Sequence, residues 1–192
     1  MLRTSVPLIG ALGVMKTSLP TFRYHPEPLA SGAVEPSNIE CVCCNRKRGF
    51  IYVGPVYAER DLNDLLCPWC ISDGSAAHQF DAGFADDRPL RKSNLAEHII
   101  EEVNRRTPAF NAWQQEQWYA HCSDACAFHG DASVEEIANA SEATKAAWRE
   151  EFSLTEEDWS LITKDYLPHG YQAFYKFVCL HCGVVLLGWD CT

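Results

Sequence analysis

The 192-residue sequence contains no run of 18 or more apolar residues, which excludes a helix that spans a bilayer. Basic side chains are few: 16 Lys and Arg stand against 26 Asp and Glu, for a formal net charge of −10. Because binding to a nucleic-acid backbone needs clustered Lys and Arg, this deficit argues against a nucleic-acid-binding protein. A glycine-rich phosphate loop, a nucleophile elbow and a His-Glu-x-x-His helix are also absent, so the common catalytic motifs do not indicate an enzyme.

The N-terminus lacks a convincing export signal. Arg3 precedes an apolar stretch from Val6 to Met15, but no small-x-small cleavage pattern follows it and Pro7 interrupts it. We expect residues 1–18 to form a flexible extension, with Met15 as the working initiator. Without an export signal the protein is expected in the cytoplasm, where thiols stay reduced.

Cysteine is the residue type that stands out. The ten cysteines are at positions 41, 43, 44, 67, 70, 122, 126, 179, 182 and 191. Cys41 and Cys44 enclose two residues, and so do Cys67 and Cys70. Two thiolates at this spacing can bind one zinc ion at about 2.3 Å, and a second pair completes a tetrahedron. Disulfides are the competing explanation, but they need an oxidising compartment. We therefore predict one structural zinc ion with a closed shell of four thiolates, with Cys43 as a spare thiol.

The sequence between and after these pairs indicates a treble-clef-like finger. Residues 50–53 and 56–57 are β-branched or aromatic and flank Gly54-Pro55, which predicts a β-hairpin. The second pair leads into residues 71–80, where we expect a helix. A knuckle, a hairpin, a second knuckle and a helix follow one another in a treble clef.

The remaining cysteines suggest a second zinc ion. Cys122 and Cys126 have the i, i+4 spacing of one helical face, whereas Cys179 and Cys182 lie between two apolar segments, as in a zinc-ribbon hairpin. The candidate ligands are these four cysteines, and any of Cys191, His121 and His181 could replace a member. The alternative is that Cys122 and Cys126 are small buried core residues.

The rest of the chain is predicted to be mainly helical. Helices are expected after Ser93 or Asn94, from Thr107-Pro108, from the capping box at Ser133 through Phe152, and from Thr155. The predicted fold class is α+β, with a treble-clef-like finger, a helical body and a C-terminal zinc-ribbon-like hairpin. The expected regions are residues 1–18, an extension; residues 19–90, an arm and the finger; and residues 91–192, the body with its cysteine hairpin.

Several longer segments resemble the bacterial CbrC-like family. They include Leu19-Pro20-Thr21-Phe22-Arg23-Tyr24-His25-Pro26, the stretch from Gly49 to Ala58, Leu66-Cys67-Pro68-Trp69-Cys70 and Trp113-Gln114-Gln115-Glu116. The resemblance covers about residue 19 to the end, and Cys41, Cys44, Cys67 and Cys70 match the paired cysteines of the family. It implies a small intracellular bacterial protein of uncharacterised biochemistry, associated with tolerance to nuclease toxins.

Charge is uneven along the chain, and this guides the functional hypothesis. Residues 131–192 carry four basic and eleven acidic side chains. Such a run is either a solvated helical face or a surface that steers a basic protein partner. We predict a protein-binding module that is not an enzyme, and in sharper form an immunity protein that masks a basic toxin such as a nuclease. The alternatives are a nucleic-acid-associated zinc finger and a zinc-dependent hydrolase; the oligomeric state stays open.

Overall fold

A three-stranded antiparallel sheet lies at the centre of the computed structural model, which describes residues 18–191. Its strands, in the order β7-β8-β9, are β7 (Ala127–Asp131), β8 (Gln172–Val178) and β9 (Val185–Cys191). Apart from Ser18, the expected extension with Met15 lies outside the described residues. All ten cysteines are free thiols. None of the helices in residues 18–191 has the length and apolarity needed to cross a membrane.

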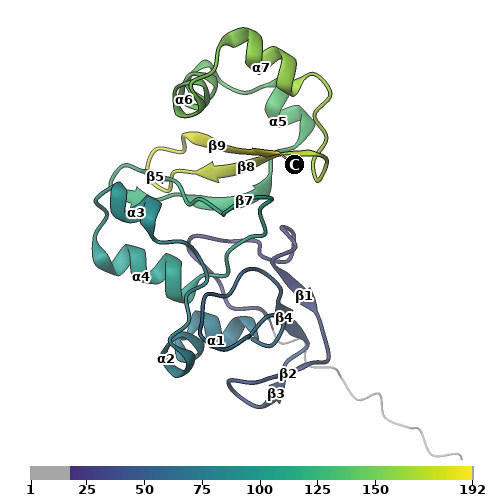
Figure 1. Cartoon of the computed structure of the whole chain (residues 1–192), viewed down its shortest axis with the longest axis vertical. Helices are drawn as coiled ribbons and strands as arrows, with labels where there is room; N and C mark the ends of the chain where they lie inside the picture. Colours follow the sequence, from purple (N-terminus) through teal and green to yellow (C-terminus); the bar gives the residue numbers. More distant parts are fainter. Residues whose placement is uncertain (1–17, 192) are drawn as a thin grey trace, which may run out of the picture.

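Three helices cover one side of this sheet (Figure 1). They are α5 (Val134–Ala138), α6 (Glu142–Phe152) and α7 (Glu156–Thr163). The capping box predicted at Ser133 and the helix expected from Thr155 are confirmed, but the single helix predicted through Phe152 is divided. The hydroxyl of Ser141 accepts the Thr144 N–H and starts a new helix there. Trp148 and Trp159 then pack on Phe174 of the sheet.

The other side of the sheet packs on α3 (Arg88–Lys92), α4 (Glu97–Arg106) and a small hairpin of β5 (Ala120–His121) and β6 (Asp124–Ala125). Ile99 and Val103 of α4 point into this core, at the helical spacing the sequence predicts. Phe110 stacks on Phe128 of β7 with ring centroids 4.0 Å apart. The body is therefore a helix–sheet assembly and not the predominantly helical one that was predicted.

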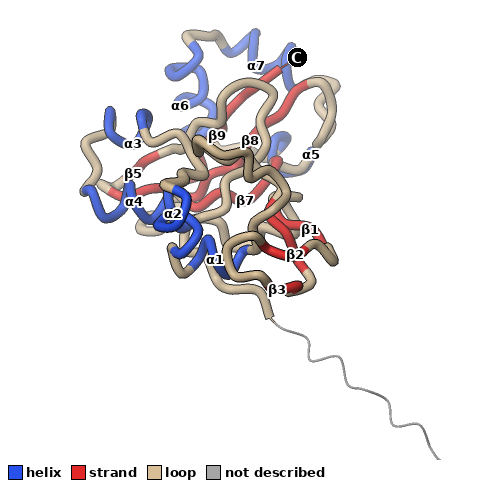
Figure 2. Tube along the Cα trace, turned by 60° about the horizontal axis from the view of Figure 1, so that its bottom comes forward, coloured by secondary structure: helices blue, strands red, loops and turns tan. Residues whose placement is uncertain are grey.

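The N-terminal region forms the end of the molecule opposite α6 and α7 (Figure 2). Its elements are β1 (Val34–Pro36), β2 (Glu40–Cys41), β3 (Arg46–Lys47), β4 (Phe50–Tyr52), α1 (Pro68–Ser72) and α2 (Ser75–Phe80). The hairpin predicted within residues 50–57 is wrong, because β4 pairs with β1 instead. The helix expected over residues 71–80 starts earlier, at Pro68, and breaks at Gly74, whose φ of +78° is left-handed.

The helix predicted from Thr107-Pro108 does not form, and the chain runs without helix from Thr107 to Tyr119. Phe110 and Trp118 are buried beneath the sheet, whereas Trp113 is 58% exposed. Phe110 and Trp118 are therefore placed by tertiary packing and not by a shared helical face. This irregular segment lies between the N-terminal region and the sheet, and it lines the cavity described below.

Candidate metal centres

The first cysteine pair lies in a tight knuckle between β2 and β3. Cys41 ends β2, and its carbonyl accepts the N–H of Asn45 at 2.8 Å, which closes the turn around Cys44. Asn45 has a φ of +52°, a left-handed conformation that Asn tolerates better than most residues. Both thiols of the pair are thereby held on one side of a two-stranded hairpin.

The second pair lies at the start of α1. Cys67 is the N-cap residue and Pro68 is the first residue of the helix, a position that proline favours because its missing N–H would have no partner there. Cys70, one turn on, donates its N–H to the Cys67 carbonyl at 3.1 Å. The Val42 N–H donates to Leu65 at 3.0 Å and fastens this second pair to the first.

The four sulfurs of these pairs form a compact group. Cys41 and Cys70 are 3.9 Å apart, Cys44 and Cys67 are 3.9 Å apart, and Cys67 and Cys70 are 3.5 Å apart. A tetrahedron with metal–sulfur bonds of about 2.3 Å has sulfur–sulfur edges of about 3.8 Å. Cys41, Cys67 and Cys70 are at most 2% exposed. The structure thus brings together the four residues predicted for the first site, in a geometry that fits a metal ion.

Electrostatics also prepares this group for a cation. Hydrogen bonding from Cys67, which includes its backbone N–H at 3.2 Å from the Cys41 sulfur, lowers the pKa of Cys41. The neighbouring Cys41 sulfur, together with burial, raises the pKa of Cys67. A divalent cation among the sulfurs would supply the positive charge that lets all four ionise.

The second cluster joins two hairpin turns from distant parts of the chain. His121 and Cys122 come from the β5–β6 hairpin, and Cys179 and Cys182 come from the β8–β9 turn. Cys122 and Ser123 have φ values of +51° and +57°, so both adopt the left-handed conformation of a two-residue hairpin turn. Gly183, with φ +72°, donates its N–H to Cys179 at 3.0 Å and closes the other knuckle as Asn45 does in the first.

Distances in the second cluster also fit a tetrahedral ion. His121 Nδ1 lies 3.2 Å from the Cys122 sulfur and 3.4 Å from the Cys182 sulfur. Metal bonds of about 2.0 Å to nitrogen and 2.3 Å to sulfur give a nitrogen–sulfur edge of about 3.5 Å. Burial opposes ionisation of Cys179, but the backbone N–H groups of Cys182 and His181 outweigh it and lower the pKa of this thiol to about 6.

Cys126, one of the predicted ligands, is not part of this group. The helix that would have placed Cys122 and Cys126 on one face is a β-hairpin, and Cys126 is fully buried in the core beneath the sheet. Burial raises the pKa of this thiol to about 12. His121 stands in its place. In the sequence analysis, His121 is only a possible substitute for one of the four cysteines. Its position next to Cys122 is the sequence signal that could have identified it as a ligand.

The other two substitutes lie elsewhere. Cys191 pairs with Gln172, at the end of the β8–β9 hairpin away from the turn. His181 Nε2 lies 2.9 Å from the carboxylate of Asp124, a buried side chain that also accepts from Arg23 at 2.6 Å and from the Tyr24 hydroxyl at 2.7 Å. Asp124 thus ties the N-terminal arm and the β8–β9 turn to the β5–β6 hairpin that carries His121 and Cys122.

Comparison with known proteins gives a family without an assigned biochemistry. The model of an uncharacterised protein family, UPF0167, matches residues 19–191. A UPF0167 protein of Pseudomonas aeruginosa is 47% identical over 170 residues, which cover 88% of this chain and 95% of that protein. A UPF0167 protein of Mycobacterium bovis is 42% identical over 172 residues, which cover 88% and 91%. No solved structure matches. Both metal clusters lie within the matched range.

Proposed function

We propose that this chain, which belongs to the uncharacterised bacterial protein family UPF0167, is a zinc-stabilised protein-binding module for a basic partner. The observation that carries the proposal is the surface of α7 and of the loop that follows it. Leu161, Leu167 and Tyr171 are 74%, 67% and 85% exposed. Apolar side chains exposed together within a polar surface mark protein interaction sites. We call these three residues, together with the exposed carboxylates of α6 and α7, the α7 surface.

Charge favours a basic partner for the α7 surface. The same end of the molecule carries α6 and α7 (Figure 1), whose acidic side chains include Glu150, Glu151, Glu156, Glu157 and Asp158. Arg149 pairs with Glu156, which leaves the other carboxylates as the dominant charge. A complementary basic surface would be steered to this end of the molecule, and its apolar side chains would then cover Leu161 and Tyr171.

The metal is proposed to be zinc, and its role structural. Thiolate-rich tetrahedral groups select zinc among the common divalent ions, and four protein ligands leave no open position for a substrate. We propose a treble-clef-like finger around the first cluster and a zinc-ribbon-like turn in the second. Ten free thiols suit a reducing compartment, which supports a cytoplasmic protein. The closed ligand shells support a protein that is not a zinc enzyme.

In its sharper form, the proposal is that the partner is a toxin. The resemblance to the CbrC-like family supports a role in tolerance to nuclease toxins, and nucleases that bind nucleic acids carry basic surfaces. An acidic protein that covers such a surface would block access to nucleic acid. The purified chain should then inhibit cleavage by its captured partner at equimolar concentration, and unaffected cleavage would leave only the broader protein-binding proposal.

Neutralising the α7 surface should slow association with the partner. We expect the triple variant Glu150→Gln, Glu151→Gln and Glu157→Gln to lower the association rate constant by about tenfold at low salt, and to flatten its salt dependence. Surface plasmon resonance against the captured and purified partner measures both. A control with three exposed glutamates of the N-terminal region changed to Gln (Glu27, Glu35 and Glu59) carries the same charge change. Equal rates for the two triple variants would contradict the proposal.

The chain should not retain DNA or RNA at physiological salt. Its longest run of basic residues is Arg46-Lys47-Arg48, which follows the first knuckle, and Arg48 lies over the Trp69 ring at 4.4 Å. Three charges contribute too little counterion release to offset the acidic remainder of the chain. Gel shifts at about 0.15 M salt should show no complex, whereas retention at micromolar protein would favour the nucleic-acid alternative.

A further inference from the structure

A small cavity lies against the irregular segment between the N-terminal region and the sheet. It has a volume of about 280 Å³ and is lined by eight residues, among them Tyr57, Asn111, Gln114, Gln115 and Glu116. Glu116 is the only charged residue of the eight. It belongs to the Trp113-Gln114-Gln115-Glu116 motif, for which neither metal cluster nor the α7 surface gives a role. This cavity is therefore a separate candidate site.

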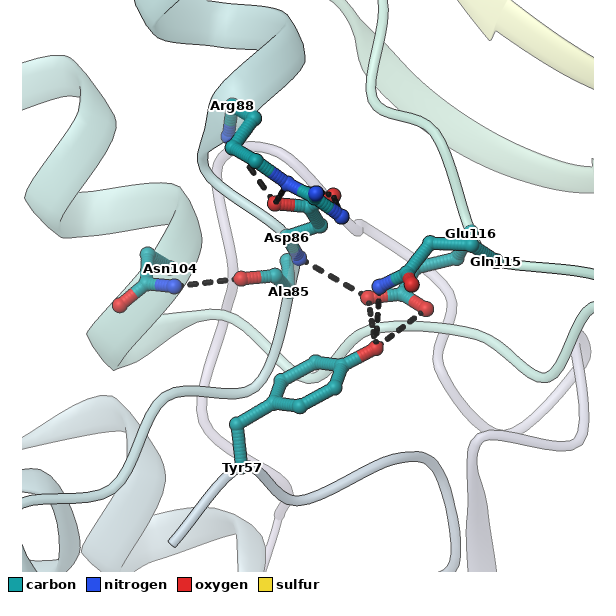
Figure 3. Close-up of polar contacts among 7 residues, drawn as sticks. All are labelled: Tyr57, Ala85, Asp86, Arg88, Asn104, Gln115 and Glu116. Carbon is teal, nitrogen blue, oxygen red and sulfur yellow. Dashed lines mark hydrogen bonds and ion pairs between the residues drawn. The ribbon is translucent and has the colours of Figure 1, made fainter.

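Glu116 is a buried carboxyl group without a cation beside it. The residue is only 4% exposed, and burial raises its pKa. The Tyr57 hydroxyl lies 2.7 and 2.8 Å from its two oxygens, and the Asp86 N–H donates to it at 2.9 Å (Figure 3). Within residues 18–191, no Lys, Arg or His nitrogen forms an ion pair with it. A buried carboxylate is costly unless a positive charge compensates it.

The hydrogen bonds around Glu116 have a defined direction. The Gln115 side-chain amide donates to the Tyr57 oxygen at 2.9 Å, which directs the Tyr57 proton toward Glu116 (Figure 3). Glu116 thus accepts from both Tyr57 and Asp86, the arrangement that stabilises an ionised carboxylate. Because Tyr57 is 42% exposed, this chain of hydrogen bonds runs from the surface to the buried charge.

The other polar groups that line the cavity also present acceptors. The side-chain amide N–H of Asn111 donates to the Val53 carbonyl at 3.2 Å, and the side-chain amide N–H of Gln115 donates to the Tyr57 hydroxyl. The carbonyl oxygens of both amides are thereby left to accept hydrogen bonds. Nearby Arg88 does not supply the missing charge, because Asp86 holds its guanidinium at 2.7 to 3.0 Å. The cavity therefore combines one negative charge with several acceptors and suits a cation with many donors.

We propose that this cavity binds a guanidinium group, which pairs with Glu116 and donates to the surrounding amide oxygens. A guanidinium has five N–H donors in one plane and can also stack on an aromatic ring such as that of Tyr57. An ammonium ion has only three donors and is more strongly hydrated, so it gains less from a partly enclosed site. The group can come from a free arginine-like molecule or from an arginine side chain of a protein. This proposal is independent of the one for the α7 surface, and an experiment can contradict either of them without affecting the other.

Calorimetric titration of the full chain with N-acetyl-arginine methylamide tests the proposal, with the citrulline analogue as the uncharged match. We expect saturable binding of the arginine compound with a Kd of about 1 mM or below, and at least about tenfold weaker binding of the citrulline compound. Equal binding of the two, or no saturation by either, would overturn it. Free L-arginine and a blocked Gly-Arg-Gly peptide, titrated in parallel, distinguish the two sources by whichever binds more tightly.

Substitutions that change the charge at the exposed Gln115 test whether the guanidinium binds in this cavity, and they leave the core unchanged. Gln115→Glu should tighten binding of the arginine compound by several-fold, whereas Gln115→Lys should weaken it by at least about tenfold. Gln117→Lys introduces the same charge two residues away, at an exposed position that does not line this cavity, and should leave the Kd within about twofold. Glu116→Gln should abolish binding if it folds. If Gln115→Lys binds as tightly as Gln117→Lys, the guanidinium does not bind here.

Discussion

Replacing Cys67 with serine is expected to release the metal from the first cluster and to unfold the N-terminal region. Cys67 contributes one sulfur, and its backbone N–H donates to another, that of Cys41. Structural zinc contributes on the order of 10 kcal/mol to folding, which is comparable to the whole stability of a typical domain, about 5–15 kcal/mol. The strands β1–β4 are two or three residues long, and without the metal they have little local stability.

Metal analysis and urea unfolding of the purified variant measure this effect. Cys43→Ser is the matched control, because Cys43 lies in the same knuckle but its sulfur contacts Ser75 and Gln79. The control should keep its metal and unfold at the same urea concentration as the parent chain. A Cys67→Ser protein that is folded throughout and retains the full metal content would contradict a structural metal at this site.

Cys179→Ser and His121→Ala are each expected to lower the metal content from two ions per chain to one. Three of the four second-cluster ligands are exposed, and only Cys179 is buried. The β8–β9 hairpin is held by seven residue pairs and by the aromatic core, so the sheet should survive the loss of this ion. The expected cost in stability is therefore smaller than at the first cluster, although a whole ion is lost.

Cys126→Ala separates the two ligand sets proposed for the second ion. Its side chain is buried in the core, so we expect a modest loss of stability of about 1 kcal/mol, within the usual range for a single substitution, and an unchanged content of two ions. Metal analysis of the three variants, each checked for folding by circular dichroism, makes the comparison. A Cys126→Ala protein with one ion, beside a His121→Ala protein with two, would restore the ligand set predicted from the sequence.

Local sequence determined the first cluster almost entirely. Each pair spans four residues, and the knuckle, the helix start at Pro68 and the two-residue spacing all act within one or two turns of chain. The capping boxes at Ser133 and Thr155 were predictable for the same reason, since the contacts that form a cap lie within four residues. The strand pairing of the N-terminal region was not predictable in this way, and β4 pairs with β1 instead of forming the predicted hairpin.

The tertiary structure decided the second cluster and the cavity at Glu116. The second cluster depends on the β5–β6 turn, which lies more than 50 residues before its partner turn in the sequence. It also depends on the burial of Cys126, which leaves His121 as the fourth candidate ligand. The cavity at Glu116 joins Tyr57, Asp86 and Glu116 from three separate segments of the chain. Spacing in a sequence reports contacts only when the secondary structure is known. The helix predicted from Thr107-Pro108 and the helical i, i+4 interpretation of Cys122 and Cys126 therefore placed these side chains wrongly. Cysteine spacing thus indicated that the chain could hold metal, whereas long-range packing selected which residues complete each cluster, because only the folded core brings distant segments within bonding distance.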